Sequence, residues 1–139
     1  MSEHLLNVYD RAAQGRADAF EVLKTWNEWA HAVDDIIDEK ITDPERIVAA
    51  HIAMFNLTRL PFYRQHASEL DGVIFAVINL WLDTVRFEQS TEMWQRAWAD
   101  AARSCGNELV VAVARLVGGW DHSRAISGAL RELSWKDQH

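Results

Sequence analysis

Apolar residues recur at intervals of three and four along most of this chain, which is the spacing of an amphipathic helix. The clearest run is Val22, Trp26, Trp29 and Val33. It predicts a long helix over residues 18–40, opened by an acidic capping box at Asp18. Similar apolar residues accompany predicted helices over residues 2–15, 68–89, 90–118 and from 121 or 123 onward, and the helix over 90–118 is expected to bend at 106–107. A further helix, over residues 44–60, is predicted from its boundary residues.

The boundaries between these helices carry local signals. Asp43 is a capping residue and Pro44 suits the first position of the helix over 44–60. Pro61 must end or kink that same helix. The pair at 118–119, two glycines, is typical of a helix end. Short connections between long helices favour antiparallel neighbours. We therefore expect an all-α fold: one domain over residues 1–139, an up-and-down bundle of four to five main helices plus a short N-terminal helix.

Composition narrows the classes of protein. The 139 residues are 49% hydrophobic and 25% charged, which is typical of a globular domain. The net charge of −7, with dispersed basic residues, argues against nucleic acid as a partner. No apolar run reaches the roughly 18 residues of a membrane span, so we expect no membrane partner. The single cysteine, Cys105, favours a reducing, cytoplasmic setting.

An acidic segment lies near the end of the helix predicted over 18–40. Asp34 and Asp38 are one helical turn apart, and Asp35 lies beside them. Carboxylates at this spacing repel one another unless a cation or solvent screens them, and Mg²⁺ is commonly held by one or two carboxylates plus substrate phosphates. The alternative is a solvated polar face opposite the tryptophans.

A second polar pair interrupts the apolar helix over 68–89. Asn79 and Asp83 are also one turn apart, between residues that are otherwise apolar. Partly buried polar groups need partners. The pair is therefore either a second set of ligands or a structural network in which Asp83 contacts Arg86 or another arginine.

The two polar segments are expected at the same depth of the bundle. If the helices over 18–40 and 68–89 run parallel, the rise of about 1.5 Å per residue puts their acids within a turn of each other. The depth along the axis follows from the spacing, whereas the direction of each side chain does not. The residues that one pole of the bundle could gather are Asp34, Asp35, Asp38, His51, Asn79, Asp83 and Asp100.

The segment from Ala32 to Glu39 resembles the first aspartate-rich motif of class I isoprenoid synthases, most closely the squalene and phytoene synthase branch. Residues 79–83 loosely resemble that branch's second motif, although Phe87 stands where its last acid would be and the chain is much shorter than the family's catalytic domain. The resemblance implies that Asp34, Asp35, Asp38 and Asp83 hold Mg²⁺ on a diphosphate-containing small molecule.

Two other functions fit the sequence. One is an all-α nucleotide pyrophosphohydrolase, in which carboxylates from two helices hold Mg²⁺ on a triphosphate and activate a water. The other is a noncatalytic interaction or oligomerisation module, because seven tryptophans in a chain of this length exceed what a core alone commonly uses. Either way we expect a homo-oligomer.

Overall fold

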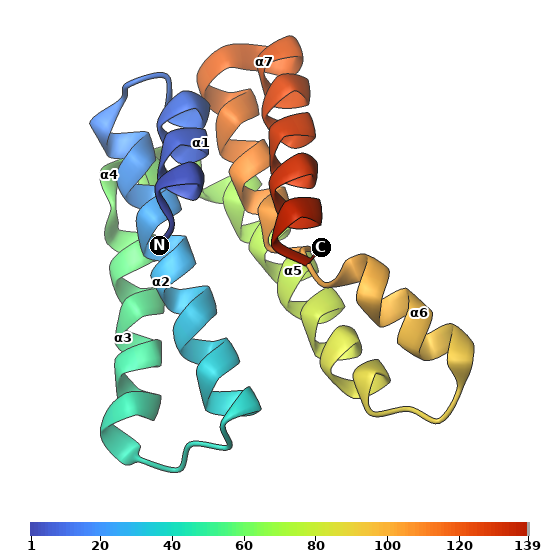
Figure 1. Ribbon diagram of the computed structural model, residues 1–139. Helices are drawn as coiled ribbons and strands as arrows, with labels where there is room; N and C mark the ends of the chain where they lie inside the picture. The colour runs from blue at the N-terminus through green and yellow to red at the C-terminus, as the bar shows by residue number, and fades with distance from the viewer. Residues whose placement is uncertain (139) are drawn as a thin grey trace.

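Every regular element of the structure, a computed structural model that describes residues 1–138, is an α-helix (Figure 1). The predicted all-α fold with a short N-terminal helix is therefore confirmed. Within the described residues, no helix is both long enough and apolar enough to cross a membrane. The helices are α1 (Glu3–Ala13), α2 (Ala17–Asp38), α3 (Pro44–Arg59), α4 (Pro61–Gln65), α5 (Ala67–Glu88), α6 (Met93–Ala102) and α7 (Asn107–Gln138).

The strongest boundary signals act as predicted. The Asp43 side chain accepts a hydrogen bond of 3.1 Å from the backbone N–H of Glu45, and Pro44 opens α3. Pro61 begins the short α4, with Leu60 alone between it and the last residue of α3. α7 turns back at Gly119, whose φ of 86° lies in the region that glycine tolerates without a steric penalty. Its second half returns alongside α1.

Two predicted boundaries are wrong. α2 begins one residue before Asp18, which lies in the first turn and accepts a hydrogen bond from the backbone N–H of Ala19. The helix predicted over 90–118 is broken between α6 and α7. At this break the carbonyl of Gly106 accepts a hydrogen bond of 3.0 Å from the indole N–H of Trp26, so the turn is tied to the core.

The hydrophobic core lies at one end of the molecule, where α1, α4, α7 and the first halves of α2 and α5 meet (Figure 1). From this core two helical hairpins extend and diverge: the α2–α3 arm and the α5–α6 arm. α2 and α5 run in the same direction, as predicted, but their far ends are spread apart. The largest fully buried side chains of the core include Leu23, Leu57, Phe62, Leu70, Leu109, Ile126 and Leu130.

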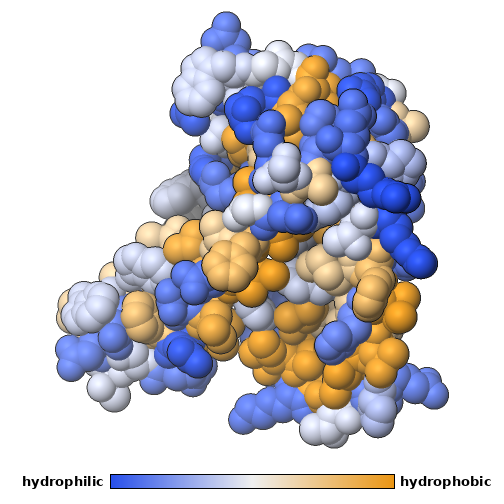
Figure 2. Space-filling view, turned by 180° about the vertical axis from the view of Figure 1, so that it is seen from behind, coloured by the Kyte–Doolittle hydropathy of each residue, from blue (hydrophilic) through white to orange (hydrophobic). Residues whose placement is uncertain are grey.

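The arms bury far less than the core. The buried residues of α3 are Ala50 and Leu57, and the buried residue of α6 is Ala99. An amphipathic helix normally packs its apolar stripe against a neighbour. Figure 2 shows instead a notch between the arms and hydrophobic side chains gathered on the surface of both. The two arms therefore present apolar surface that the chain itself does not cover.

Candidate functional site

The acidic segment of α2 lies beside the second half of α5, with an open cleft of about 440 Å³ between them. Asp34 and Asp38 line it from α2, and Thr84 and Glu88 line it from α5. Arg103, just after α6, closes one side; its guanidinium lies 3.9 Å from the carboxylate of Glu88. The structure thus brings acids from two distant segments and one arginine to a shared cleft.

Asp34 is the perturbed group in this cleft. Its partial burial raises the pKa above the ordinary aspartate value, and repulsion from the carboxylates of Asp38 and Asp35 raises it further. The charged form of Asp34 is therefore less favourable here than in water. A cation that entered the cleft would relieve that cost.

Asp35, the third acid of the segment, faces another way. Its carboxylate lies 3.8 Å from the guanidinium of Arg46 on α3, and the carboxylate of Glu39 lies 3.8 Å from the same group. All three side chains are half exposed or more, so these ion pairs contribute little stability. Asp35 thus faces α3 within the α2–α3 arm and does not line the cleft.

Asn79 and Asp83 do not line the cleft either. Asn79 is exposed and Asp83 is half-buried on α5. Between Asn79 and Asp83 along α5, the residue that borders the cleft beside α2 is Trp81. Since each residue rotates a helix by about 100°, Asn79 and Asp83 point roughly 200° away from Trp81. Arg86 is also exposed.

The other two predicted residues lie apart. The carboxylate of Asp100 lies 3.5 Å from the guanidinium of Arg103 and is largely exposed. His51 borders a different, apolar groove on α3, where its Nδ1 lies 2.9 Å from the carbonyl oxygen of Ile47. Of the seven residues expected at one pole, only Asp34 and Asp38 border the acidic cleft.

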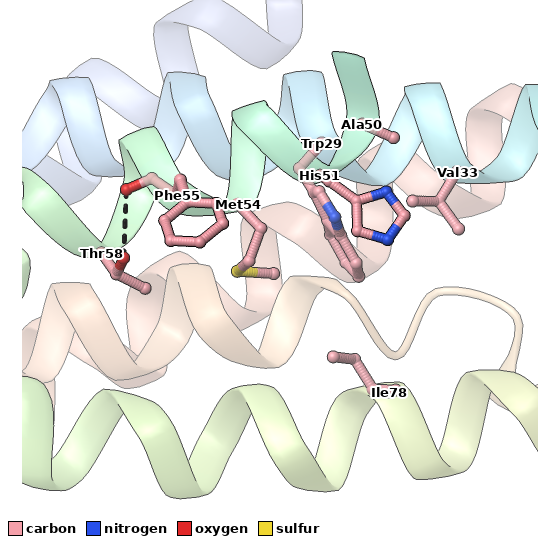
Figure 3. Close-up of a pocket in the computed structure, with 8 residues that line it drawn as sticks. All are labelled: Trp29, Val33, Ala50, His51, Met54, Phe55, Thr58 and Ile78. Atoms are coloured by element: carbon pink, nitrogen blue, oxygen red, sulfur yellow. Dashed lines mark hydrogen bonds between the residues drawn. The ribbon is translucent and has the colours of Figure 1, made fainter. Parts of the chain in front are cut away.

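The apolar groove is the feature that the polar motifs did not indicate. It has a volume of about 430 Å³ and lies between the α2–α3 arm and Ile78 of α5 (Figure 3). Trp29, Met54 and Phe55 line it, and Figure 3 shows the Phe55 ring at its edge, beside Thr58. The signal for it is present in the sequence as the three-and-four spacing of apolar residues over 48–55 and 75–82.

Within residues 1–138, no group of three or more His, Cys, Asp or Glu side chains is arranged to hold a metal ion. No family model, curated protein or solved structure matches the chain. The site must therefore be interpreted from its own geometry, which offers an acidic cleft and an apolar groove of similar volume.

Asp34→Asn is expected to stabilise the protein at neutral pH. A carboxyl whose folded pKa is raised binds more protons in the folded than in the unfolded state, so its destabilising effect appears as pH rises through that pKa. Replacing the Asp34 carboxyl should raise the free energy of unfolding by about 0.2–0.5 kcal/mol near neutral pH, the scale of a like-charge pair one turn apart. Near pH ~3 the replacement should leave the free energy of unfolding unchanged.

Urea unfolding of Asp34→Asn and wild type at both pH values measures this difference. Glu28→Gln, an exposed position on the same helix, is the matched control. A variant less stable than wild type at neutral pH would show that the Asp34 carboxylate has a favourable partner in the folded protein.

Proposed function

We propose that this protein is a noncatalytic helical oligomerisation module, and that the apolar surface of its two arms is the contact region. Two sets of side chains form this region. The α3 stripe is Val48, Ile52 and Phe55, and the α5 stripe is Phe75, Ile78 and Leu82.

The exposure of these stripes carries the proposal. Val48, Ile52 and Phe55 are 56%, 51% and 63% exposed, and Phe75 is 78% exposed. A single exposed apolar residue is ordinary, but contiguous apolar surface of this kind is typical of an interaction site. Covering it removes apolar area from water at about 25 cal/mol per Å².

A separate group of exposed aromatic residues lies on the α5–α6 arm, where α6 packs against Phe87. Trp94 and Trp98 are 61% and 36% exposed, and both pack edge-on against Phe87, at ring-centroid distances of 5.7 and 5.5 Å. Tryptophan is enriched among residues that dominate binding energy at interfaces. Part of the tryptophan content that favoured an interaction module is thus exposed on the α5–α6 arm.

Size-exclusion chromatography with light scattering tests the proposal on the full chain over a wide concentration range. A mass of twice the single chain, falling toward the monomer on dilution, is the expected result. A monomer at every concentration would contradict homo-oligomerisation.

A second function is favoured by the acidic cleft: Mg²⁺-dependent binding of a diphosphate-containing small molecule. Asp34 and Asp38 supply two carboxylates, as many as Mg²⁺ commonly takes from protein when phosphates supply other oxygens. Arg103 borders the same cleft and suits a phosphate oxygen. Within residues 1–138 no group of three or more His, Cys, Asp or Glu side chains is arranged to hold a metal ion. This second proposal is therefore limited to binding and does not include turnover.

Calorimetry with Mg²⁺ and pyrophosphate tests this second function. Heat that saturates in wild type and disappears in Asp34→Asn would support it, and the absence of heat in wild type would contradict it. Separate titrations with a prenyl diphosphate and a nucleoside triphosphate would distinguish an isoprenoid-synthase-like site from a pyrophosphohydrolase-like one.

A further inference from the structure

The α3 stripe and the α5 stripe have the spacing of a coiled-coil seam. Val48, Ile52 and Phe55 are separated by four and three residues, and the α5 stripe by three and four. Alternation of three and four is the pattern by which one helix packs along another. Each stripe therefore fits a helix of similar length and similar seam.

Charged residues frame both stripes in the same order. Glu45 precedes the α3 stripe by three residues and Arg59 follows it by four. Asp71 precedes the α5 stripe by four residues and Arg86 follows it by four. At these spacings the charges lie on the same side of the helix as the apolar residues. Each seam thus begins with an acid and ends with a base.

These framing charges have few partners in the chain. Within residues 1–138, Glu45, Arg59 and Arg86 form no ion pair, whereas Asp71 accepts a hydrogen bond from the hydroxyl of Tyr63. The arginines that do form ion pairs within this range are Arg16, Arg46, Arg103, Arg115 and Arg131.

From this charge order we infer that the surface is covered by a second copy of the chain, with the α3 stripe of each copy packed antiparallel against the α5 stripe of the other. The inference rests on the proposed oligomerisation function. A parallel pairing would place acid against acid and base against base, whereas an antiparallel pairing places opposite charges together at both ends.

The spacing sets a single register for this pairing. Aligning the two seams centre to centre places Ile52 of one copy opposite Ile78 of the other. The framing charges then meet across the contact. A two-fold axis generates the same pairing twice. The remaining pairs across the contact are Val48 with Leu82, Phe55 with Phe75, Glu45 with Arg86 and Arg59 with Asp71.

A charge-reversal cycle tests the register. Glu45→Arg and Arg86→Glu, each alone, are expected to raise the dimer Kd about tenfold, because each turns two attractive contacts into repulsive ones. The double variant is expected to return to within about threefold of wild type. Pairing of α3 with α3 would place Glu45 against Arg59, and pairing of α5 with α5 would place Arg86 against Asp71, so neither predicts this rescue.

The matched controls are Glu3→Arg and Arg11→Glu, which make the same charge changes in the first and last turns of α1. Both are expected to leave the Kd unchanged, and circular dichroism checks that every variant is folded. If Arg86→Glu does not fold, Arg59→Glu with Glu45→Arg tests the register: the double variant is expected to bind more weakly than either single variant, whereas pairing of α3 with α3 would rescue it. A chain that dimerises without rescue overturns the register alone, and a wild type that stays monomeric overturns both the register and the proposed function.

Discussion

Ile52→Glu is expected to dissociate the dimer, raising its Kd by at least about a hundredfold. Ile52 is the central residue of the α3 stripe and is 51% exposed in the single chain. Glutamate is a good helix former and tolerates exposure, so the monomer should keep its fold. In the dimer, however, it would place a carboxylate in an apolar seam, once for each copy. Sedimentation equilibrium measures the change.

The control for this variant is Leu6→Glu. Leu6 is 37% exposed on α1, far along the chain from either stripe, and receives the same change. Its Kd should match that of wild type. An Ile52→Glu variant that associates as tightly as wild type would show that the α3 stripe lies outside the contact.

Phe62→Ala is expected to lower the free energy of unfolding by about 3–5 kcal/mol, a large share of a typical domain's total. Phe62 is fully buried in α4, with the guanidinium of Arg16 5.2 Å from its ring centroid and the ring of His66 4.6 Å away. Truncation removes its burial and leaves a cavity in the core. Urea unfolding, at a concentration where the chain is monomeric, measures the loss.

Phe75→Ala is the matched control, because the same residue type is 78% exposed there. Its cost to the monomer should be below about 0.5 kcal/mol, whereas its Kd for dimerisation should rise. Equal losses of monomer stability in Phe62→Ala and Phe75→Ala would contradict the division between a covered core and uncovered arms.

The sequence predicted the fold well where single residues act through the backbone. Asp43 and Pro44 open α3, Pro61 separates α3 from α4, and Gly119 reverses α7, as their chemistry requires. The break between α6 and α7 was expected only as a bend. At the break Gly106 accepts a hydrogen bond from Trp26, 80 residues away, a contact that no local pattern encodes.

The candidate site was harder to predict because position along a helix does not fix direction around it. Asp34 and Asp83 do lie on helices that run the same way. However, α5 is oriented by its packing residues, which turn Trp81 toward the cleft and carry Asp83 away from it. Arg103 was missed because it follows a helix end that the sequence did not reveal.

The exposed stripes illustrate a further limit. Both segments, 48–55 and 75–82, carry apolar residues at intervals of three and four, and the structure exposes these residues on α3 and α5. A single sequence does not state whether such a face packs within its own chain or against another. The exposures of the individual side chains show that both stripes remain open to solvent, and Figure 2 shows the notch between the two arms.

The most direct measurement of the central claim is an isotope-filtered nuclear Overhauser experiment on a mixture of labelled and unlabelled chains. It detects contacts between methyl groups of different copies and no others. We expect cross-peaks between Ile52 of one copy and Ile78 of the other. A spectrum without intermolecular cross-peaks from either stripe, at concentrations where the chains would be associated, would contradict the central claim.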